Sequence, residues 1–359
     1  GDHVVELLLV DDALFGEDFE DLLGVHGGKS AAVGKGGEKL LGGLGILASA
    51  TMTLDELQTA VTKVKAATDK PFGINMRADA GDADARCDLL IREGVKVASF
   101  ALAPKPELIA KLKDAGVVVI PSVGLAKHAK KVASWGADAV IVQGGEGGGH
   151  TGPIATTLLL PSVLDAVAGT GMPVIAAGGF FDGRGLAAAL SYGAAGVAMG
   201  TRFLLTSDST VPDAVKQRYL EAALDGTVVS TRVDGMPHRV LRTGLVEKLE
   251  SGSPVRGLVA AVGNAQKFKK MSGMTWRSMV KDGLAMRHGK DLTWSQVVMA
   301  ANTPMLLKAG LVEGNTEAGV LASGQVAGIV EDLPACSELV PQIAAEAIEH
   351  LQAASSYIQ

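Results

Sequence analysis

Residues 140–152 carry the pattern in this chain that is best suited to chemistry. An apolar run ends at Gln143, and five glycines follow it, interrupted by Glu146 and ended by His150. Glycine has no Cβ, so a glycine-rich backbone can approach a flat or anionic ligand closely. We therefore expect this stretch to end a barrel strand and to hold a cofactor beside one acid/base residue. Gly144 and Gly145 are candidates for contact with that cofactor.

His150 is the main candidate for proton transfer. An imidazole changes charge near pH 7, so it can give or take a proton there. The alternative is a loop histidine that only bonds a backbone carbonyl. Glu146 is the reserve candidate, either as a charged loop residue or as an orienter of His150.

Polar side chains also end other apolar runs. Asn75 has amide donors and an acceptor that suit the polar edge of a planar cofactor. A core amide bonded to a neighbouring strand is the alternative interpretation. Ser122 and Gln143 end two further runs and are expected to face the same mouth of a barrel.

Small residues end the last two predicted strands. Gly178 and Gly179 end one of them, and Gly200 and Thr201 end the next. If residues 4–10 form the first strand, these are strands 7 and 8, whose loops commonly bind phosphate in α/β barrels. Open N–H groups, the Thr201 hydroxyl and a helix start after each strand would attract an anion. A purely steric role for each glycine pair is the alternative.

Basic clusters elsewhere are weaker candidates. His238 lies near Arg232, Arg239 and Arg242 in the sequence. This group could hold a substrate phosphate, but a surface ion-pair network is the favoured interpretation. His128, among lysines on a predicted helix, is assigned to a solvated face.

Several motifs are missing from the sequence. The glycine stretch lacks the Gly-Lys-Ser/Thr of a P-loop, and no G-x-G-x-x-G follows a first strand. There is no serine nucleophile elbow and no HExxH. Cys87 and Cys336 show no metal-ligand spacing, so no metal is expected.

Short apolar runs alternate with amphipathic segments along most of the chain. Such alternation predicts parallel strands joined by right-handed crossovers, and eight of them favour a closed (β/α)8 TIM barrel of the α/β class. The predicted strands cover 4–10, 45–49, 72–76, 97–101, 117–123, 139–143, 174–179 and 196–201. The predicted helices cover 54–67, 84–93, 106–115, 126–135, 158–168, 183–191 and 213–224. Glycines 94, 116, 136 and 193 are expected to end four of them.

The chain is longer than the roughly 250 residues of a single barrel. We predict a barrel over 1–228 and an inserted, mainly helical lobe over the active site at 229–332. Residues 333–359 would return to the barrel as a C-terminal helix. No site residue is drawn from 1–43, because that segment uses only ten residue types.

Composition limits the partners. The net charge of −6 is spread without long runs, which argues against nucleic acid. No apolar stretch approaches the roughly 18 residues that span a bilayer, and no signal peptide is seen. The expected partner is a small molecule, the expected location is the cytoplasm, and a homodimer is a candidate assembly.

Six motifs occur together in an order that resembles one known family. They are Gly42-Gly-Leu-Gly-Ile-Leu, Pro71-Phe-Gly-Ile-Asn, Gly145-Glu-Gly-Gly-Gly-His-Thr-Gly, Ala177-Gly-Gly-Phe-Phe-Asp-Gly-Arg-Gly, Met199-Gly-Thr-Arg-Phe and Ala322-Ser-Gly-Gln-Val-Ala-Gly. This set resembles the nitronate monooxygenase (2-nitropropane dioxygenase-like) flavoproteins, and the enoyl-ACP reductase II enzymes share it. The stretch from Gly43 to Leu333 looks most similar to actinobacterial members assigned to steroid-ring breakdown.

The resemblance implies an FMN-bearing barrel in which His150 is catalytic. Carried over by motif, the FMN ligands are Asn75, Gln143, Gly178, Gly179, Gly200 and Thr201, and Ser122, Gly144 and Gly145 are added at the same mouth. Two departures stand out. Nothing in 1–43 matches the family's Pro/Gln-x-x-Met-type first loop, and Ser122 stands where some members carry lysine.

The resulting hypothesis is an FMN-dependent oxidoreductase. It would oxidise or reduce a C–C bond of a CoA thioester derived from a steroid ring, with His150 as the acid/base and NAD(P)H as a candidate reductant. Oxidation of nitronates by O2 is the first alternative. A non-catalytic flavin- or phosphate-binding barrel is the second.

Overall fold

The computed structural model describes most of the chain. The described residues are 5–10, 42–233, 235–251, 303 and 305–357. The prediction for residues 252–302, the middle of the expected helical lobe, lies outside them.

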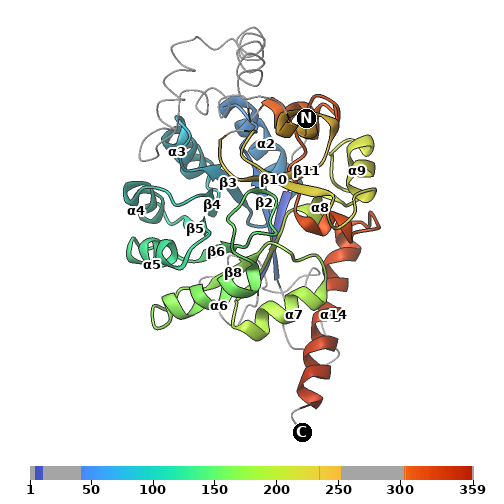
Figure 1. The fold of residues 1–359 in the computed structure, drawn as a ribbon. Coiled ribbons are helices and arrows are strands. Elements are labelled where there is room, and N and C mark those ends of the chain that lie inside the picture. The colour runs from blue at the N-terminus through green and yellow to red at the C-terminus, as the bar shows by residue number, and fades with distance from the viewer. Residues whose placement is uncertain (1–4, 11–41, 234, 252–302, 304, 358–359) are drawn as a thin grey trace.

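Eight strands close into a barrel, as predicted (Figure 1). Their order around the barrel is β1-β2-β3-β4-β5-β6-β8-β9. The strands are β1 (Val5–Val10), β2 (Gly42–Ala48), β3 (Gly73–Arg77), β4 (Val97–Ala101), β5 (Val118–Val123), β6 (Val140–Gln143), β8 (Val174–Ala177) and β9 (Gly196–Met199). The six neighbouring pairs from β2 round to β9 are all parallel, so their carboxyl ends meet at one mouth.

The prediction of eight parallel strands was wrong for β1. This strand pairs antiparallel with both of its neighbours, β2 and β9. An apolar run indicates that a strand is buried, but it does not show in which direction the strand runs. Because β1 runs the opposite way, its carboxyl end lies at the other mouth. The carboxyl-end mouth is therefore built from seven strand ends.

Seven of the barrel helices begin and end close to the predicted residues, and the short α8 was not predicted as a helix. The barrel helices are α2 (Leu54–Ala67), α3 (Ala83–Glu93), α4 (Pro106–Asp114), α5 (Ala126–Ser134), α6 (Thr156–Val167), α7 (Gly183–Tyr192), α8 (Thr201–Leu204) and α9 (Asp213–Leu220). Thr53 and Glu56 form a capping box at the start of α2. The four predicted helix-ending glycines, 94, 116, 136 and 193, all have positive φ, which favours glycine.

An apolar plug fills the barrel interior. It consists of Leu44, Ile46, Val97, Ile120, Ala139, Ile141, Ile175, Ala177, Ala195 and Ala198. Successive side chains on a strand alternate between its two faces. Side chains two residues farther along these strands therefore continue the plug toward the carboxyl-end mouth.

A small second sheet stands beside the barrel. It has the order β10-β11-β7, with β10 at Thr227–Ser230, β11 at His238–Leu241 and β7 at Gly149–His150. Helix was expected here from the sequence, and β10 and β11 were not predicted, because four-residue strands are too short to show alternation. The Asp-Gly pair at 234–235, a common hairpin signal, could have indicated them.

After β11, the longer regular elements of the described chain are helical. They are α10 (Gly244–Ser251), a π-helix at Lys308–Val312, a 3-10 helix at Gln325–Gly328 and α14 (Cys336–Ser356). The predicted C-terminal helix agrees with α14, which packs along α7 (Figure 1). The lobe boundaries themselves stay a prediction.

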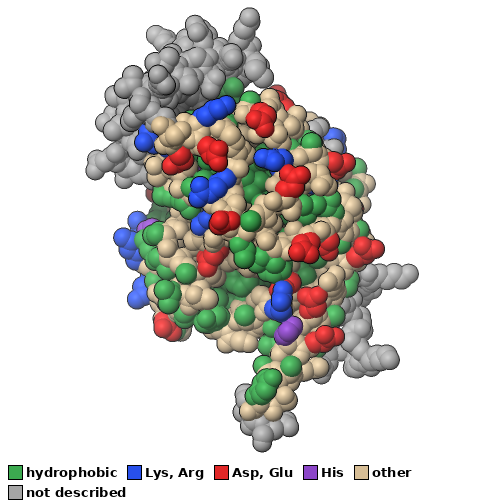
Figure 2. All heavy atoms as spheres, turned by 45° about the vertical axis from the view of Figure 1, so that its right-hand side comes forward, with side chains coloured by type: hydrophobic (Ala, Val, Ile, Leu, Met, Phe, Trp, Pro, Cys, Tyr) green, Lys and Arg blue, Asp and Glu red, His purple; other side chains and the backbone are tan. Residues whose placement is uncertain are grey.

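Acidic, basic and apolar side chains are interspersed over the face in Figure 2. Among the described helices, none combines the length and apolar character needed to cross a membrane.

The contact between α7 and α14 depends on a glycine. A Cβ at Gly183 would overlap the Glu346 side chain and the backbone of α14 at Ile343 and Ala347. We predict that Gly183→Ala lowers the free energy of unfolding by about 1–3 kcal/mol, because two packed helices must separate. Urea denaturation measures the change. The control is Gly124→Ala, since Gly124 has no positive φ and no atom within 4 Å of an added Cβ. Equal stability of the two variants would contradict the prediction.

Candidate functional site

A ring of polar side chains covers the apolar plug at the carboxyl-end mouth. Asn75, Ser99, Ser122 and Gln143 each lie two residues beyond an interior position of β3, β4, β5 or β6. The Asn75 amide nitrogen donates to Ser99 Oγ at 3.1 Å. The neighbouring-strand bond considered for Asn75 is therefore present, and it orients the amide within the ring. The sequence analysis did not single out Ser99, although it follows Val97 by the same spacing.

Gln143 links this polar ring to the glycine loop, residues 144–150. Its Nε2 donates to the carbonyl oxygens of Gly148 at 3.2 Å and His150 at 3.0 Å. One side chain thus holds the far end of the loop over the end of its own strand. The loop also bonds the next strand, because Gly144 N–H donates to the Ala177 carbonyl at 3.0 Å.

Three loop glycines are explained by the protein's own packing. A Cβ at Gly144 would overlap Thr156, one at Gly147 would lie 2.6 Å from Gln143 Nε2, and one at Gly148 would lie 2.6 Å from Gly324 N. From the sequence, these glycines were expected to allow close approach of a ligand. At these three positions the approaching atoms belong to the chain itself.

Glu146 is a helix cap. Its carboxylate accepts hydrogen bonds from Thr156 N–H at 3.0 Å and from Thr156 Oγ1 at 2.8 Å. A carboxylate at the first turn of α6 also interacts favourably with the helix dipole. Its observed contacts therefore fix the start of α6, which leaves His150 as the acid/base candidate of the loop.

His150 packs against a second histidine. His150 in β7 pairs with His238 in β11, and their ring centroids are 4.7 Å apart at an interplanar angle of 47°. His238 is 2% exposed, whereas His150 is half-buried. The buried ring therefore supports one side of the more accessible one. His238 was expected in a surface ion-pair network, and its burial corrects that expectation.

The arginines predicted to cluster near His238 do not act as one group, because Arg239 and Arg242 bond to different carbonyls. Arg239 donates through Nε and Nη2 to the Gly145 carbonyl, at 3.0 and 2.8 Å, and through Nη1 to Thr227 Oγ1. Burial lowers the pKa of the Arg239 guanidinium, and the Glu146 carboxylate opposes that shift. Arg242 instead donates to the Asp225 carbonyl. Arg239 is thus a support of the glycine loop.

The ends of β8 and β9 offer open backbone donors. Gly178 and Gly179 have φ of +92° and +88°, and Gly200 is exposed with open space where a Cβ would lie. Within the described ranges, the N–H groups of Gly179, Gly200 and Thr201 have no hydrogen-bond acceptor. Unpaired donors at neighbouring strand ends suit an anionic group.

The helix N-termini that follow β8 and β9 were expected to attract an anion, but they are not available for this. Asp182 accepts from Gly185 N–H and Glu346 accepts from Gly183 N–H, so α7 begins with carboxylates already in place. The helix after β9, α8, has only four residues. Anion binding at this edge would therefore depend on the strand-end backbone.

A late segment, residues 321–325, hydrogen-bonds to β11, to the end of β9 and to the glycine loop. Ser323 N–H donates to the Arg239 carbonyl, Gly324 N–H to Thr201 Oγ1 and Gln325 N–H to the Glu146 carbonyl. The Thr201 hydroxyl, predicted to face a phosphate, thus already accepts a bond from the chain. The motif beginning at Ala322 therefore joins the glycine loop to the end of β9.

Metal chemistry has no candidate among the described residues, which contain no group of three or more His, Cys, Asp or Glu placed to hold an ion. Cys87 and Cys336 are free thiols. Burial raises the pKa of the Cys87 thiol to about 11, so this thiol stays protonated at neutral pH.

Comparison with known proteins gives consistent matches over nearly the whole chain. The family model described as nitronate monooxygenase matches residues 31–86 and 79–346. A Mycobacterium tuberculosis protein named (3aS,4S,5R,7aS)-5-hydroxy-7a-methyl-1-oxo-octahydro-1H-indene-4-carboxyl-CoA dehydrogenase is 80% identical over 318 residues, covering 89% of this chain and 90% of that protein. A Rhodococcus jostii protein of the same name is 73% identical, covering 87% and 88%.

Solved structures also match. FabK from Thermotoga maritima is 32% identical with a TM-score of 0.69, over 94% of this chain and 98% of that one. Nitroalkane oxidase from Streptomyces ansochromogenes is 27% identical with a TM-score of 0.64, over 87% and 90%.

The placement of residues 321–325 generates a stability prediction. Tyr219 is fully buried, and its hydroxyl donates to the Ala322 carbonyl at 2.6 Å. Burial raises the pKa of this phenol, so it remains a donor throughout the physiological range. We predict that Tyr219→Phe lowers the free energy of unfolding by about 1–2 kcal/mol, because a buried carbonyl loses its partner. Chemical denaturation measures the loss. Tyr192→Phe, at a 45% exposed position, is the control, and a similar small effect for both would contradict the prediction.

Proposed function

Because this chain belongs to the nitronate monooxygenase family of oxidoreductases, we propose that it is an FMN-dependent dehydrogenase of a ring carboxyl-CoA thioester. The two relatives with 80% and 73% identity carry the name of such a dehydrogenase. The observation that carries the assignment of roles is the position of His150. It is half-buried, held by Gln143 of the polar ring and supported by the buried His238 ring.

The residues at the carboxyl-end mouth fit FMN. Asn75, Ser122 and Gln143 would meet the polar edge of the ring system, and the strand-end N–H groups of Gly179 and Gly200 would meet the phosphate. When bound, FMN supplies the two-electron acceptor of the reaction. Thr201 would contribute its backbone N–H and its hydroxyl proton, since the hydroxyl oxygen accepts from Gly324 N–H and its own O–H can still donate.

The chain's own part in the reaction is proton transfer. A dehydrogenation removes one hydrogen as a proton and the other, with two electrons, as a hydride from the adjacent carbon. The thioester carbonyl acidifies the neighbouring C–H, and His150 would take that proton as general base. His238 contributes by keeping the His150 ring in place, as a positioning residue.

The first test is anaerobic reduction of the FMN-loaded enzyme. We expect the CoA thioester named for the two relatives to bleach the flavin absorbance, because without O2 the electrons stay on the cofactor. His150→Asn should slow the bleaching at least 100-fold, in the range lost with a general base. Stopped-flow absorbance at matched flavin content provides the rates.

Propionate 3-nitronate and NADH are the comparison substrates. Bleaching by the nitronate alone would assign nitronate oxidation instead, and bleaching by NADH alone would assign a reductase. If His150→Asn reacts as fast as the wild type, His150 is not the base. A protein that binds no flavin would overturn the proposal as a whole.

A second prediction concerns the phosphate end of the cofactor. The space beside Gly200 is open and its φ is −94°, so Gly200→Ala introduces no clash within the protein. We predict unchanged thermal stability of the apoprotein but at least tenfold weaker FMN retention, measured by equilibrium dialysis. Gly124→Ala, also with open space, is the matched control. Equal FMN affinity of the two variants would show that FMN does not approach Gly200.

A further inference from the structure

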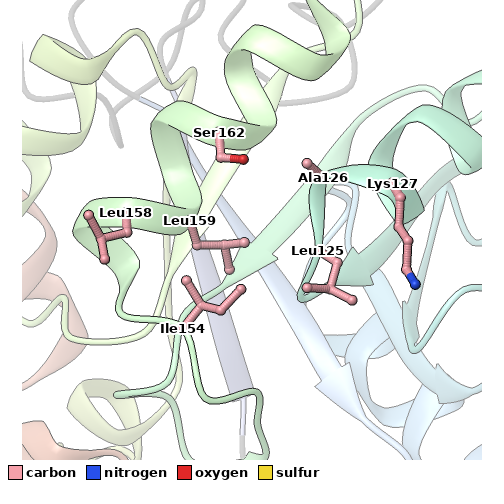
Figure 3. Close-up of a pocket in the computed structure, with 7 residues that line it drawn as sticks. All are labelled: Leu125, Ala126, Lys127, Ile154, Leu158, Leu159 and Ser162. Atoms are coloured by element: carbon pink, nitrogen blue, oxygen red, sulfur yellow. The ribbon is translucent and has the colours of Figure 1, made fainter.

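A groove of about 400 Å³ lies on the rim of the barrel between the first turns of α5 and α6. It is lined by Leu125, Ala126, Lys127, Ile154, Leu158, Leu159 and Ser162 (Figure 3). Both helices follow the carboxyl ends of barrel strands, so the groove opens on the same side of the barrel as His150. Leu158 is 69% exposed, which leaves apolar surface available in the groove wall.

The groove lies next to the glycine loop. Only three residues separate Ile154 from His150, and the Ile154 carbonyl accepts from Gly145 N–H at 2.7 Å. On the other side, an added Cβ at Gly152 would lie 3.9 Å from the Gly124 carbonyl oxygen, next to Leu125. A ligand reacting at His150 therefore has a short path along this rim.

The charge of this rim differs from that of the whole chain. The protein carries a net charge of −6, yet residues 124–134 and 151–164 contain three lysines, one histidine and no aspartate or glutamate. The Glu146 carboxylate, which lies at the start of α6, is bound to Thr156. Lys127, Lys130 and Lys131 are all exposed. Lys130 and Lys131 follow Lys127 by three and four positions, so both neighbour it on the surface of α5. Burial and the charges of Lys127 and Lys131 lower the pKa of His128, consistent with a positive local potential.

We propose that this groove is the subsite for the pantetheine and nucleotide arm of the CoA thioester. Leu125, Ile154 and Leu158 would contact the apolar parts of the pantetheine, and Lys127 and Lys130 would meet the phosphates. Lys131 lies 4.8 Å from the Trp135 ring centroid, so its ammonium is partly engaged with that ring. The inference rests on the proposed function, because it takes a CoA thioester as the substrate.

Charge complementarity favours this occupant over a second copy of the chain. A second copy would bring an excess of acidic charge spread over its whole surface, whereas CoA concentrates several negative charges on its phosphates beside an apolar arm. The phosphates of CoA match the exposed lysines of α5 in charge, and its apolar arm matches the apolar groove beside them.

The test is the binding of free coenzyme A to the FMN-loaded enzyme, measured by calorimetry, with pantetheine as the probe that lacks the nucleotide phosphates. We expect Lys127→Glu to weaken CoA binding at least tenfold and to leave pantetheine binding unchanged. CoA binding to the wild type should also weaken as salt is raised, because exposed charges are screened. Lys96→Glu is the control, since Lys96 is exposed and precedes β4 at the opposite mouth.

A second variant tests the apolar wall. Leu158→Asp should weaken the binding of CoA and of pantetheine alike, and the exposure of Leu158 makes it tolerable for folding. The proposal is overturned if Lys127→Glu binds CoA like Lys96→Glu, or if Leu158→Asp changes only the oligomeric state. These binding results do not depend on turnover. Lysine-dependent CoA binding without flavin bleaching would sustain the subsite and reject the proposed reaction.

Discussion

The hydrogen bonds of Gln143 to the carbonyls of Gly148 and His150 are the interaction on which the site depends. A loop with five glycines loses much conformational entropy when it is ordered, roughly 0.5–1 kcal/mol more per glycine than for alanine. Two neutral hydrogen bonds contribute only about 1–3 kcal/mol in total, so Gln143 alone does not offset that cost. The charged bonds of Arg239 to Gly145 and of Glu146 to Thr156 supply the remainder.

These supports come from parts of the chain that are distant in sequence. Arg239 and His238 lie on β11, and the Glu146 and Arg239 carbonyls accept bonds from residues 323–325. A change in the late segment therefore acts on the loop through backbone bonds rather than through contact with a ligand. A related constraint explains the glycine at 148, where an added Cβ would lie 2.6 Å from the backbone of Ser323 and Gly324.

Much of the barrel could be predicted from the sequence, because buried strands and amphipathic helices impose their periodicities locally. The αL glycine 94 followed from capping chemistry, whereas the capping box at the start of α2 was not part of the prediction. The direction of β1 could not be predicted, since apolar periodicity is the same for both directions. The pairing of β7 with β11 also escaped, because it joins residues 149–150 to 238–239 without a local pattern.

The same distinction applies to the site residues: some have a local sequence pattern, and others depend on distant neighbours. Asn75, Ser122 and Gln143 were predicted because their strands end in a recognisable way; the structure places them in one ring, and their contact with a cofactor stays a prediction. Ser99 was not predicted, and His238 was expected on the surface rather than buried beside His150, since both placements arise from neighbours on other strands. Arg239 was noticed for its charge, but its function as a loop support depends on a carbonyl 94 positions away.

The capping of the rim helices shows how anions would be distributed around His150. The N–H groups at the starts of α6 and α7 already bond the carboxylates of Glu146, Asp182 and Glu346, so they are not available to a phosphate. The start of α5 has no acidic residue in its first turn and no side-chain cap. In the barrel order, β5 lies on one side of β6 and the pair β8 and β9 lies on the other. The glycine loop after β6 therefore separates the proposed cofactor-phosphate edge from the proposed CoA groove. Two phosphate-bearing molecules could then approach His150 from opposite sides without competing for the same donors.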